Sequence, residues 1–309
     1  MELFSVIVTN ASQPYVSSLC ELMIKELKHL HNERDGVQLR YEQFEHYAVI
    51  TGTAALPGFE LHKSANEIYN CLGVSLAEHI LKFEERAIMR DLIKREFKYE
   101  QPNEIDTIEG YCNQFLYGEP EPLLSEDEVK SRRKKRIAEQ VKEYFQENTD
   151  MILEGFLRFR LQDYVEDMRE VVEYAIDEFV MDRQYQEFIS LLRYFVYIQE
   201  AKIPVAHLIH KGGHEFVILN DQLEPIDTQE FESSFTLEVL EKDINFEDMI
   251  VSTLITVSPA NIHIHTREPE MAVIKTIMQI FEERATVCPY CRMCHAFLGD
   301  VKKQDQLYP

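Results

Sequence analysis

The chain has 309 residues, of which 45% are hydrophobic, including 18 Phe and 15 Tyr. This composition differs from that of disordered chains, and the length is sufficient for two or three domains with cores of their own. The 55 acidic residues outnumber the 32 Lys and Arg residues, which gives a formal net charge of -23. A negative field of this size disfavours nucleic acids and anionic membranes as partners. A protein partner with a basic surface fits this charge better, but the favoured interpretation is that the acidic surface keeps the protein in solution.

The N-terminus predicts a protein that is not exported. Leu3–Val8 is a short apolar run without a basic leader, and the chain contains no uninterrupted apolar stretch of about 18 residues. We therefore expect a cytoplasmic protein without a membrane segment. In that compartment clustered cysteines more often bind metal or undergo redox chemistry than form structural disulfides.

The first third of the sequence predicts a small α/β unit followed by a helical region. Leu3–Val8 is typical of a strand, and the spacing of apolar residues predicts a helix from Tyr15 to Leu30. Two alternating segments, Val37–Phe44 and His46–Thr51, predict a pair of strands. Helical spacing then extends from Ser64 to Phe97.

A break follows this unit. Gly118 together with Pro120 and Pro122 indicates a linker, so we place a domain boundary there. Ser125 and Glu128 match a capping box, which predicts that the next helix begins at this point.

The central region predicts two helices. Apolar residues recur at steps of three and four over Leu161–Val180 and again over Tyr185–Val196. The short polar break at Asp182 and Arg183 predicts that these helices form an antiparallel pair.

The last third predicts a second α/β unit. Val205–His210 and His214–Leu219 flank a Gly-rich turn and predict a β-hairpin. The remaining predicted elements are a helix over 246–256, a strand over 261–265, a helix over 269–281 and a strand over 285–287. The predicted fold is thus a helix-rich mixed α/β (α+β) protein with domains 1–118, 119–200 and 201–309.

The strongest local signal is a cysteine cluster near the C-terminus. Cys288, Cys291 and Cys294 form C-x-x-C-x-x-C, and His295 follows directly. This spacing allows a loop to turn three thiolates toward one centre, as in zinc sites or at the start of a bacterial iron–sulfur motif. The sequence predicts a metal site, with zinc favoured over iron–sulfur. The fourth ligand would be His295, a distant residue or another chain, and the alternatives are thiol redox chemistry and a metal-free tail.

The other cysteine patterns give weaker signals. Cys291–His295 also matches the haem-attachment motif C-x-x-C-H, but covalent haem attachment is typical of exported proteins. Cys20, Cys71 and Cys112 lie in helical patterns, so we expect them to act as small buried hydrophobic residues.

A basic run lies in the helix predicted after the linker. Its members are Lys130, Arg132, Arg133, Lys134, Lys135 and Arg136. This run is where an anionic partner, such as RNA or DNA, would dock. The favoured interpretation is a solvated helix face paired with acidic neighbours, because no aromatic residues interleave the charges as stacking sites.

Histidines gather around the predicted hairpin. His207, His210 and His214 lie on or beside it, whereas His263 and His265 share one face of a later strand. Since His207 and His210 point to opposite faces of a strand, a common metal site would need a distortion. We expect these histidines to be exposed or hydrogen bonded within the fold.

Signatures of well-marked enzymes are missing. The sequence contains no Gly-rich phosphate loop, nucleophile elbow or H-E-x-x-H motif. The carboxylates are spread along helix faces without a recognisable acid and base pair. A noncatalytic protein is therefore favoured, although catalytic residues distant in sequence are an open alternative.

Several segments carry a family resemblance. They are FLRFRLQDY at 156–164, AIDEF at 175–179, EFISLLRYFV at 187–196 and DMIVSTLITVSP at 248–259, followed by His263-Ile264-His265 and the three clustered cysteines. In this order they resemble the YtxC-like family of sporulation proteins. The resemblance implies a cytoplasmic role in endospore formation and carries no activity, substrate or catalytic residue.

Together these features predict a noncatalytic regulatory or adaptor protein that binds a protein partner. The alternative is a metal-binding or thiol-redox factor that uses Cys288, Cys291, Cys294 and His295.

Overall fold

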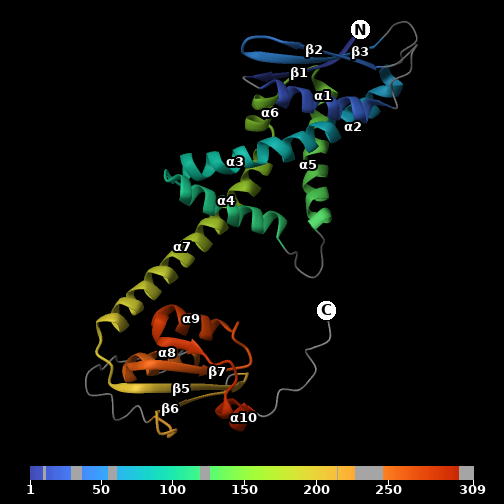
Figure 1. Cartoon of the computed structure of the whole chain (residues 1–309). Coiled ribbons are helices and arrows are strands. Elements are labelled where there is room, and N and C mark those ends of the chain that lie inside the picture. The colour runs from blue at the N-terminus through green and yellow to red at the C-terminus, as the bar shows by residue number, and fades with distance from the viewer. Residues whose placement is uncertain are drawn as a thin grey trace. The chain divides into compact units, whose positions relative to one another are not determined.

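A computed structural model describes residues 1–9, 12–28, 37–54, 61–118, 126–213, 215–226 and 246–298. The chain divides into two units, Met1–Met181 and Asp182–Pro309. Each unit combines one four-stranded sheet with helices (Figure 1). The predicted helix-rich mixed α/β class is confirmed. The predicted linker after Gly118 falls in the first unit, where residues 119–125 lie outside the described part of the chain.

The sheet of the first unit has the strand order β2-β3-β1-β4. Its strands are β1 Glu2–Thr9, β2 Val37–Gln43, β3 Tyr47–Ala54 and β4 Asp150–Ile152. β1 pairs antiparallel with β3 and parallel with β4. Phe4, Val6 and Val8 of β1 are buried, and the ring of Phe4 fills the space where Gly52 of β3 has no side chain. The N-terminal strand is therefore one of the two inner strands of this sheet.

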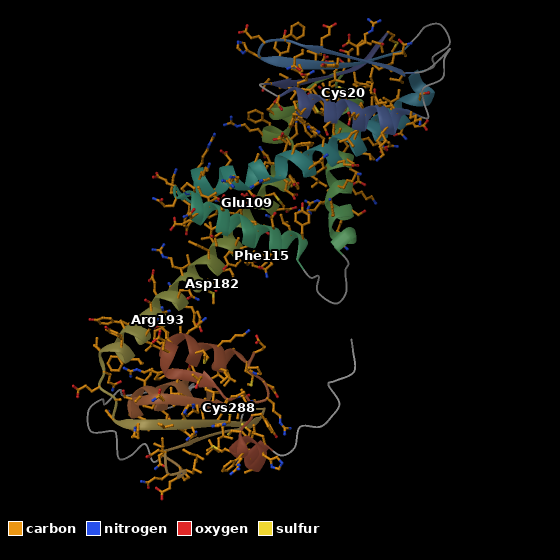
Figure 2. The ribbon with its side chains drawn as sticks, viewed as in Figure 1. Cys20, Glu109, Phe115, Asp182, Arg193 and Cys288 are labelled. Atoms are coloured by element: carbon orange, nitrogen blue, oxygen red, sulfur yellow. The ribbon has the colours of Figure 1, made fainter. Side chains whose placement is uncertain are left out.

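Helices complete the first unit. They are α1 Gln13–Leu27, α2 Leu61–His79, α3 Glu85–Asp91, α4 Pro102–Tyr117, α5 Glu126–Glu147, α6 Leu153–Phe159 and the first part of α7 Gln162–Ile198. Two π-helical turns, Ile80–Glu84 and Leu92–Glu96, flank α3. The helical region predicted from Ser64 to Phe97 is therefore continuous but changes its winding twice. Cys20 lies on α1 and Glu109 on α4 (Figure 2).

The prediction that a break at Asp182 and Arg183 separates two central helices is wrong. Residues Gln162–Ile198 form the single helix α7, which contains neither Gly nor Pro. Two polar residues such as Asp182 and Arg183 do not end a helix by themselves. Arg183 in fact forms an ion pair of 3.1 Å with Glu187, one turn later in the same helix.

The two apolar stripes of α7 serve different cores. Met168 and Val172 belong to the core of the first unit, whereas Ile189 and Val196 belong to that of the second. Arg193 of α7 also forms a 3.0 Å ion pair with Glu282 within the second unit (Figure 2). One long helix that contacts two cores therefore has the apolar spacing that the sequence analysis assigned to two shorter helices.

The second unit has the strand order β6-β5-β7-β8. Its strands are β5 Ile203–Gly212, β6 Glu215–Leu219, β7 Pro259–His265 and β8 Ala285–Val287. β5 and β6 form the predicted hairpin, in which Gly212 and Gly213 adopt φ angles of 120° and 60° that favour glycine. β7 lies parallel to both β5 and β8.

Helices cover one face of this second sheet. Leu208 and Ile264 are paired on β5 and β7, and they belong to a core that includes residues of α7, α8 Phe246–Val257 and α9 Ala272–Phe281. Because side chains alternate along a strand, His207, His263 and His265 lie on the opposite face. That face carries α10 Arg292–Leu298 and the cysteine cluster.

Among the described residues, no helix has both the length and the apolar character needed to cross a membrane.

Candidate metal centre

The cysteines meet a histidine at one edge of the second sheet. His265 is the last residue of β7, and Cys288 directly follows the parallel neighbour β8. The Cys288 N–H donates to the carbonyl of Ile264 at 2.8 Å, which continues the pairing of the two strands. Since the carboxyl ends of parallel strands meet at the same edge of a sheet, both side chains arrive at one place.

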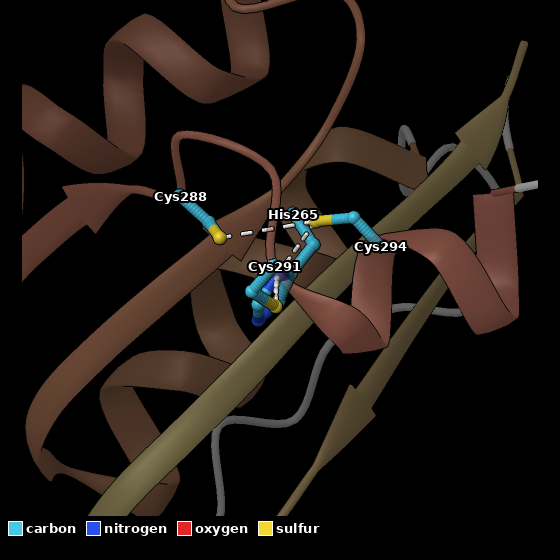
Figure 3. A group of neighbouring side chains, drawn as sticks. All are labelled: His265, Cys288, Cys291 and Cys294. Atoms are coloured by element: carbon cyan, nitrogen blue, oxygen red, sulfur yellow. Dashed lines mark hydrogen bonds between the residues drawn. The ribbon is translucent and has the colours of Figure 1, made fainter. Parts of the chain in front are cut away.

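The chain then turns back toward this edge. Tyr290 adopts a φ of 86°, a left-handed conformation that is rare for an aromatic residue. After this turn comes Cys291, followed by α10, which carries Cys294. Figure 3 shows the side chains of Cys288, Cys291 and Cys294 gathered around His265.

The distances in this group suit a tetrahedral metal site. The four potential ligand atoms, one from each of His265, Cys288, Cys291 and Cys294, lie within 4.8 Å of one another. The His265 Nδ1 atom is 3.2 Å from the Cys294 Sγ and 3.7 Å from the Cys291 Sγ, and the Cys294 and Cys288 sulfurs are 3.8 Å apart. Around a tetrahedral Zn²⁺, ordinary bond lengths separate two sulfurs by about 3.8 Å and sulfur from nitrogen by about 3.6 Å.

Burial differs across the group. His265 and Cys294 are buried, Cys288 is partly buried and Cys291 is exposed. Burial, with the nearby His207 and His263, lowers the pKa of His265 to about 4, so its imidazole is neutral at physiological pH, as a metal ligand must be.

The thiols also differ in acidity. Burial raises the pKa of Cys294 to about 11. At Cys291 burial acts in the same direction, but hydrogen bonds from the backbone N–H groups of Cys294 and Met293 help to bring its pKa below the usual value. Cys291 therefore ionises more readily than Cys294 to the thiolate, which is the form that binds a metal.

The structure brings together three of the four ligands suggested by the sequence. His295 does not belong to the group of potential ligands found among the described residues, and His265 takes part instead. The backbone N–H of His295 donates to the carbonyl of Cys291, the residue before α10. His265 could have been found from its position at the end of a strand, provided that the parallel pairing with Ala285–Val287 had been known.

Among the described residues, the other histidines of the second sheet are not part of the group formed by His265 and the cysteines. His210 hydrogen bonds to Thr266 at 2.9 Å and to the Gly213 carbonyl at 3.1 Å, on the face opposite to His207. His263 bonds to Thr286 at 3.1 Å. The expectation of hydrogen-bonded histidines agrees with these contacts, whereas His214 lies outside the described residues.

The basic run is partly neutralised by the fold. Arg133 forms a 2.9 Å ion pair with the buried Glu85, and Lys134 forms one of 2.7 Å with Glu78. Arg136 pairs with Asp167. The remaining members, Lys130, Arg132 and Lys135, are exposed. Because three of its six charges face acidic neighbours, the run is a weak candidate for an anion-binding surface.

Comparison with known proteins identifies the family. A model of the YtxC-like family matches residues 70–286, a range that includes His265 and ends just before Cys288. The Bacillus subtilis (strain 168) protein named "Uncharacterized protein YtxC" is 26% identical over 240 residues, which cover 78% of this chain and 83% of that protein. No solved structure matches the chain. Since the family model matches more than half of the sequence, this chain belongs to the YtxC-like family.

Proposed function

We propose that this protein is a noncatalytic, zinc-dependent adaptor of endospore formation. The observation that carries the zinc site is the convergence of His265, Cys288, Cys291 and Cys294. Three thiolates and one imidazole form a common ligand set of structural zinc. Four protein ligands fill the tetrahedral shell, whereas catalytic zinc sites keep one position for water or substrate. The donor set therefore favours a structural role.

The zinc ion would hold α10 against the second sheet. α10 has only 7 residues, fewer than an isolated helix needs for stability in water. Its buried ligand Cys294 faces His265 of β7, and Cys288 extends β8. A metal held by these residues joins α10 to the ends of β7 and β8.

The adaptor role rests on other features. The sequence lacks strong enzyme motifs, and its net charge of -23 favours a partner with a basic surface. The role in endospore formation, in the cytoplasm, rests on the family resemblance.

The role in endospore formation is tested in a Bacillus subtilis strain without the related YtxC protein. Heat-resistant spores should become fewer in that strain, and expression of this chain should restore their number. An unchanged spore count would contradict the role.

The zinc site is tested by elemental analysis of protein purified anaerobically without chelator. We expect about one zinc per chain in the wild type, as four ligands bind one ion. Replacing Cys288, Cys291 and Cys294 together by Ser should abolish binding, and His265→Asn should weaken it strongly. Cys20→Ser, in the first unit, is the matched control and should keep the metal. Wild-type protein that lacks metal while its thiols are reduced would contradict the proposal.

Thiol redox chemistry is the second candidate. It is favoured by the exposure and lowered pKa of Cys291 and by the 3.8 Å distance between the sulfurs of Cys288 and Cys294. The same preparation separates the two functions: a redox factor would contain no stoichiometric zinc, and its thiols would react rapidly with a disulfide reagent. Zinc-bound thiolates would be protected until the metal is removed.

A further inference from the structure

His207 contacts the metal ligand His265 from the neighbouring strand. β5 and β7 pair in parallel, with His207 opposite His263 and Ile209 opposite His265, so the histidines lie on one face of the sheet. The Nδ1 atom of His207 is 3.2 Å from the Nε2 atom of His265. The other nitrogen of His265, Nδ1, faces the sulfurs of Cys294 and Cys291. The two ring nitrogens of His265 therefore have separate partners.

This arrangement determines which ring nitrogen of His265, Nδ1 or Nε2, carries the proton. A neutral imidazole has one N–H group and one nitrogen with a free lone pair, and only the latter can bind a metal. If His265 donates its Nε2–H to the Nδ1 atom of His207, its own Nδ1 atom is left free toward the thiols. His207 then carries its proton on Nε2. The hydrogen bond also fixes the rotation of the His265 ring.

We propose that His207 is a positioning residue that prepares the Nδ1 atom of His265 for zinc. The inference rests on the proposed zinc function and adds a residue outside the ligand set. Hydrogen-bond partners of this kind change metal affinity by about 10- to 100-fold when they are removed. His207 is partly buried, so its contact with His265 is only partly open to competition from water.

His263 provides a matched control. It lies on the same sheet face, stacks on His207 with ring centroids 5.5 Å apart, and hydrogen bonds to Thr286. Its described contacts do not include a hydrogen bond to His265. Removing His263 therefore changes packing on this face without removing the acceptor for the His265 proton.

The experiment measures zinc affinity of the full chain by competition with a chromophoric chelator, and the absorption spectrum of the Co²⁺-loaded protein. We expect His207→Ala to weaken zinc binding by about 10- to 100-fold and to shift the Co²⁺ bands, while His263→Ala stays close to wild type. His207→Asn should restore much of the affinity, because its side-chain oxygen can accept the same hydrogen bond near the position of Nδ1. This variant also serves if His207→Ala fails to fold.

The outcomes are distinct. Wild-type affinity in His207→Ala would overturn the inference while leaving the zinc site intact. Equal losses in His207→Ala and His263→Ala, or no recovery in His207→Asn, would show that packing rather than the hydrogen bond matters, and would also overturn it. A wild-type protein that binds no zinc would instead refute the proposed function on which the inference depends.

Discussion

Glu85 forms a buried polar network in the first unit. It is 2% exposed, and its carboxylate accepts hydrogen bonds from Arg133, Tyr117 and Tyr164. Burial and the bond to Glu85 raise the pKa of Tyr117 to about 12, so this phenol remains a donor at neutral pH. Breaking a buried ion pair leaves one charge without its partner. We therefore predict that Glu85→Gln lowers the free energy of unfolding by about 3–5 kcal/mol in urea titrations.

The exposed pair of Arg136 with Asp167 is the control for that measurement. Its side chains are 55% and 41% exposed, so solvent screens their attraction. Asp167→Asn should lower the free energy of unfolding by at most about 1 kcal/mol. Similar losses in Glu85→Gln and Asp167→Asn would show that burial does not distinguish the two pairs.

His79 makes the stability of the first unit depend on pH. It is fully buried against Tyr15 and Phe83, and neither ring nitrogen has a hydrogen-bond partner in the described structure. Burial, and then Lys82, lowers its pKa to about 4. An unfolded histidine has a pKa of about 6.5, so the unfolded state binds a proton that the folded state does not between these values. Stability contributed by the neutral ring is therefore lost as the pH falls from about 6.5 to 4.

His79→Phe should remove this dependence because the aromatic ring remains and the proton site does not. We predict that the free energy of unfolding of the wild type, measured relative to the variant, falls by up to about 3 kcal/mol between pH 7 and pH 4. Parallel pH profiles for both proteins would show that His79 is not held neutral by the fold.

Among the helices and strands, the continuous helix α7 is the largest difference between the structure and the prediction from the sequence. All side chains from Met181 to Phe188 are exposed. None of these side chains belongs to either core, so the helix in this stretch depends on its backbone hydrogen bonds, with one side-chain hydrogen bond of 2.9 Å between Tyr185 and Thr276 of α9. Proline at position 184 would remove one donor and clash with the preceding turn, at a cost of about 3 kcal/mol.

We predict that Gln184→Pro abolishes protection of the Met181–Phe188 amides against hydrogen exchange, whereas Gln184→Ala leaves it unchanged. Mass spectrometry of the exchanged protein measures both. If these amides are already unprotected in the wild type, the chain contains two helices with a break, as the polar pair Asp182 and Arg183 had suggested.

Local sequence patterns predict most of the helices and strands, but they do not predict the metal ligand His265. The strand Glu2–Thr9, the hairpin around Gly212 and the helix Phe246–Val257 follow from periodicity and turn residues that lie close together in the sequence. One helix that packs into two cores has the same apolar periodicity as two separate helices, so periodicity alone cannot distinguish them. His265 also could not be chosen from spacing, because its approach to Cys288 depends on parallel strand pairing.

The two units of the molecule contain different polar groups. The first unit contains the polar network of Glu85, and the second contains the histidine and cysteine group. A zinc-dependent adaptor needs only that the second unit holds its metal firmly and presents a stable surface to a partner. The proposed function therefore depends on which residues bind the metal.

X-ray absorption at the zinc edge of the purified full chain identifies the ligands of the metal. We predict three sulfur ligands at about 2.3 Å and one nitrogen at about 2.0 Å, with the nitrogen lost in His265→Asn and kept in His295→Asn. A shell in which His295→Asn removes the nitrogen, or in which no protein nitrogen is present, would contradict it.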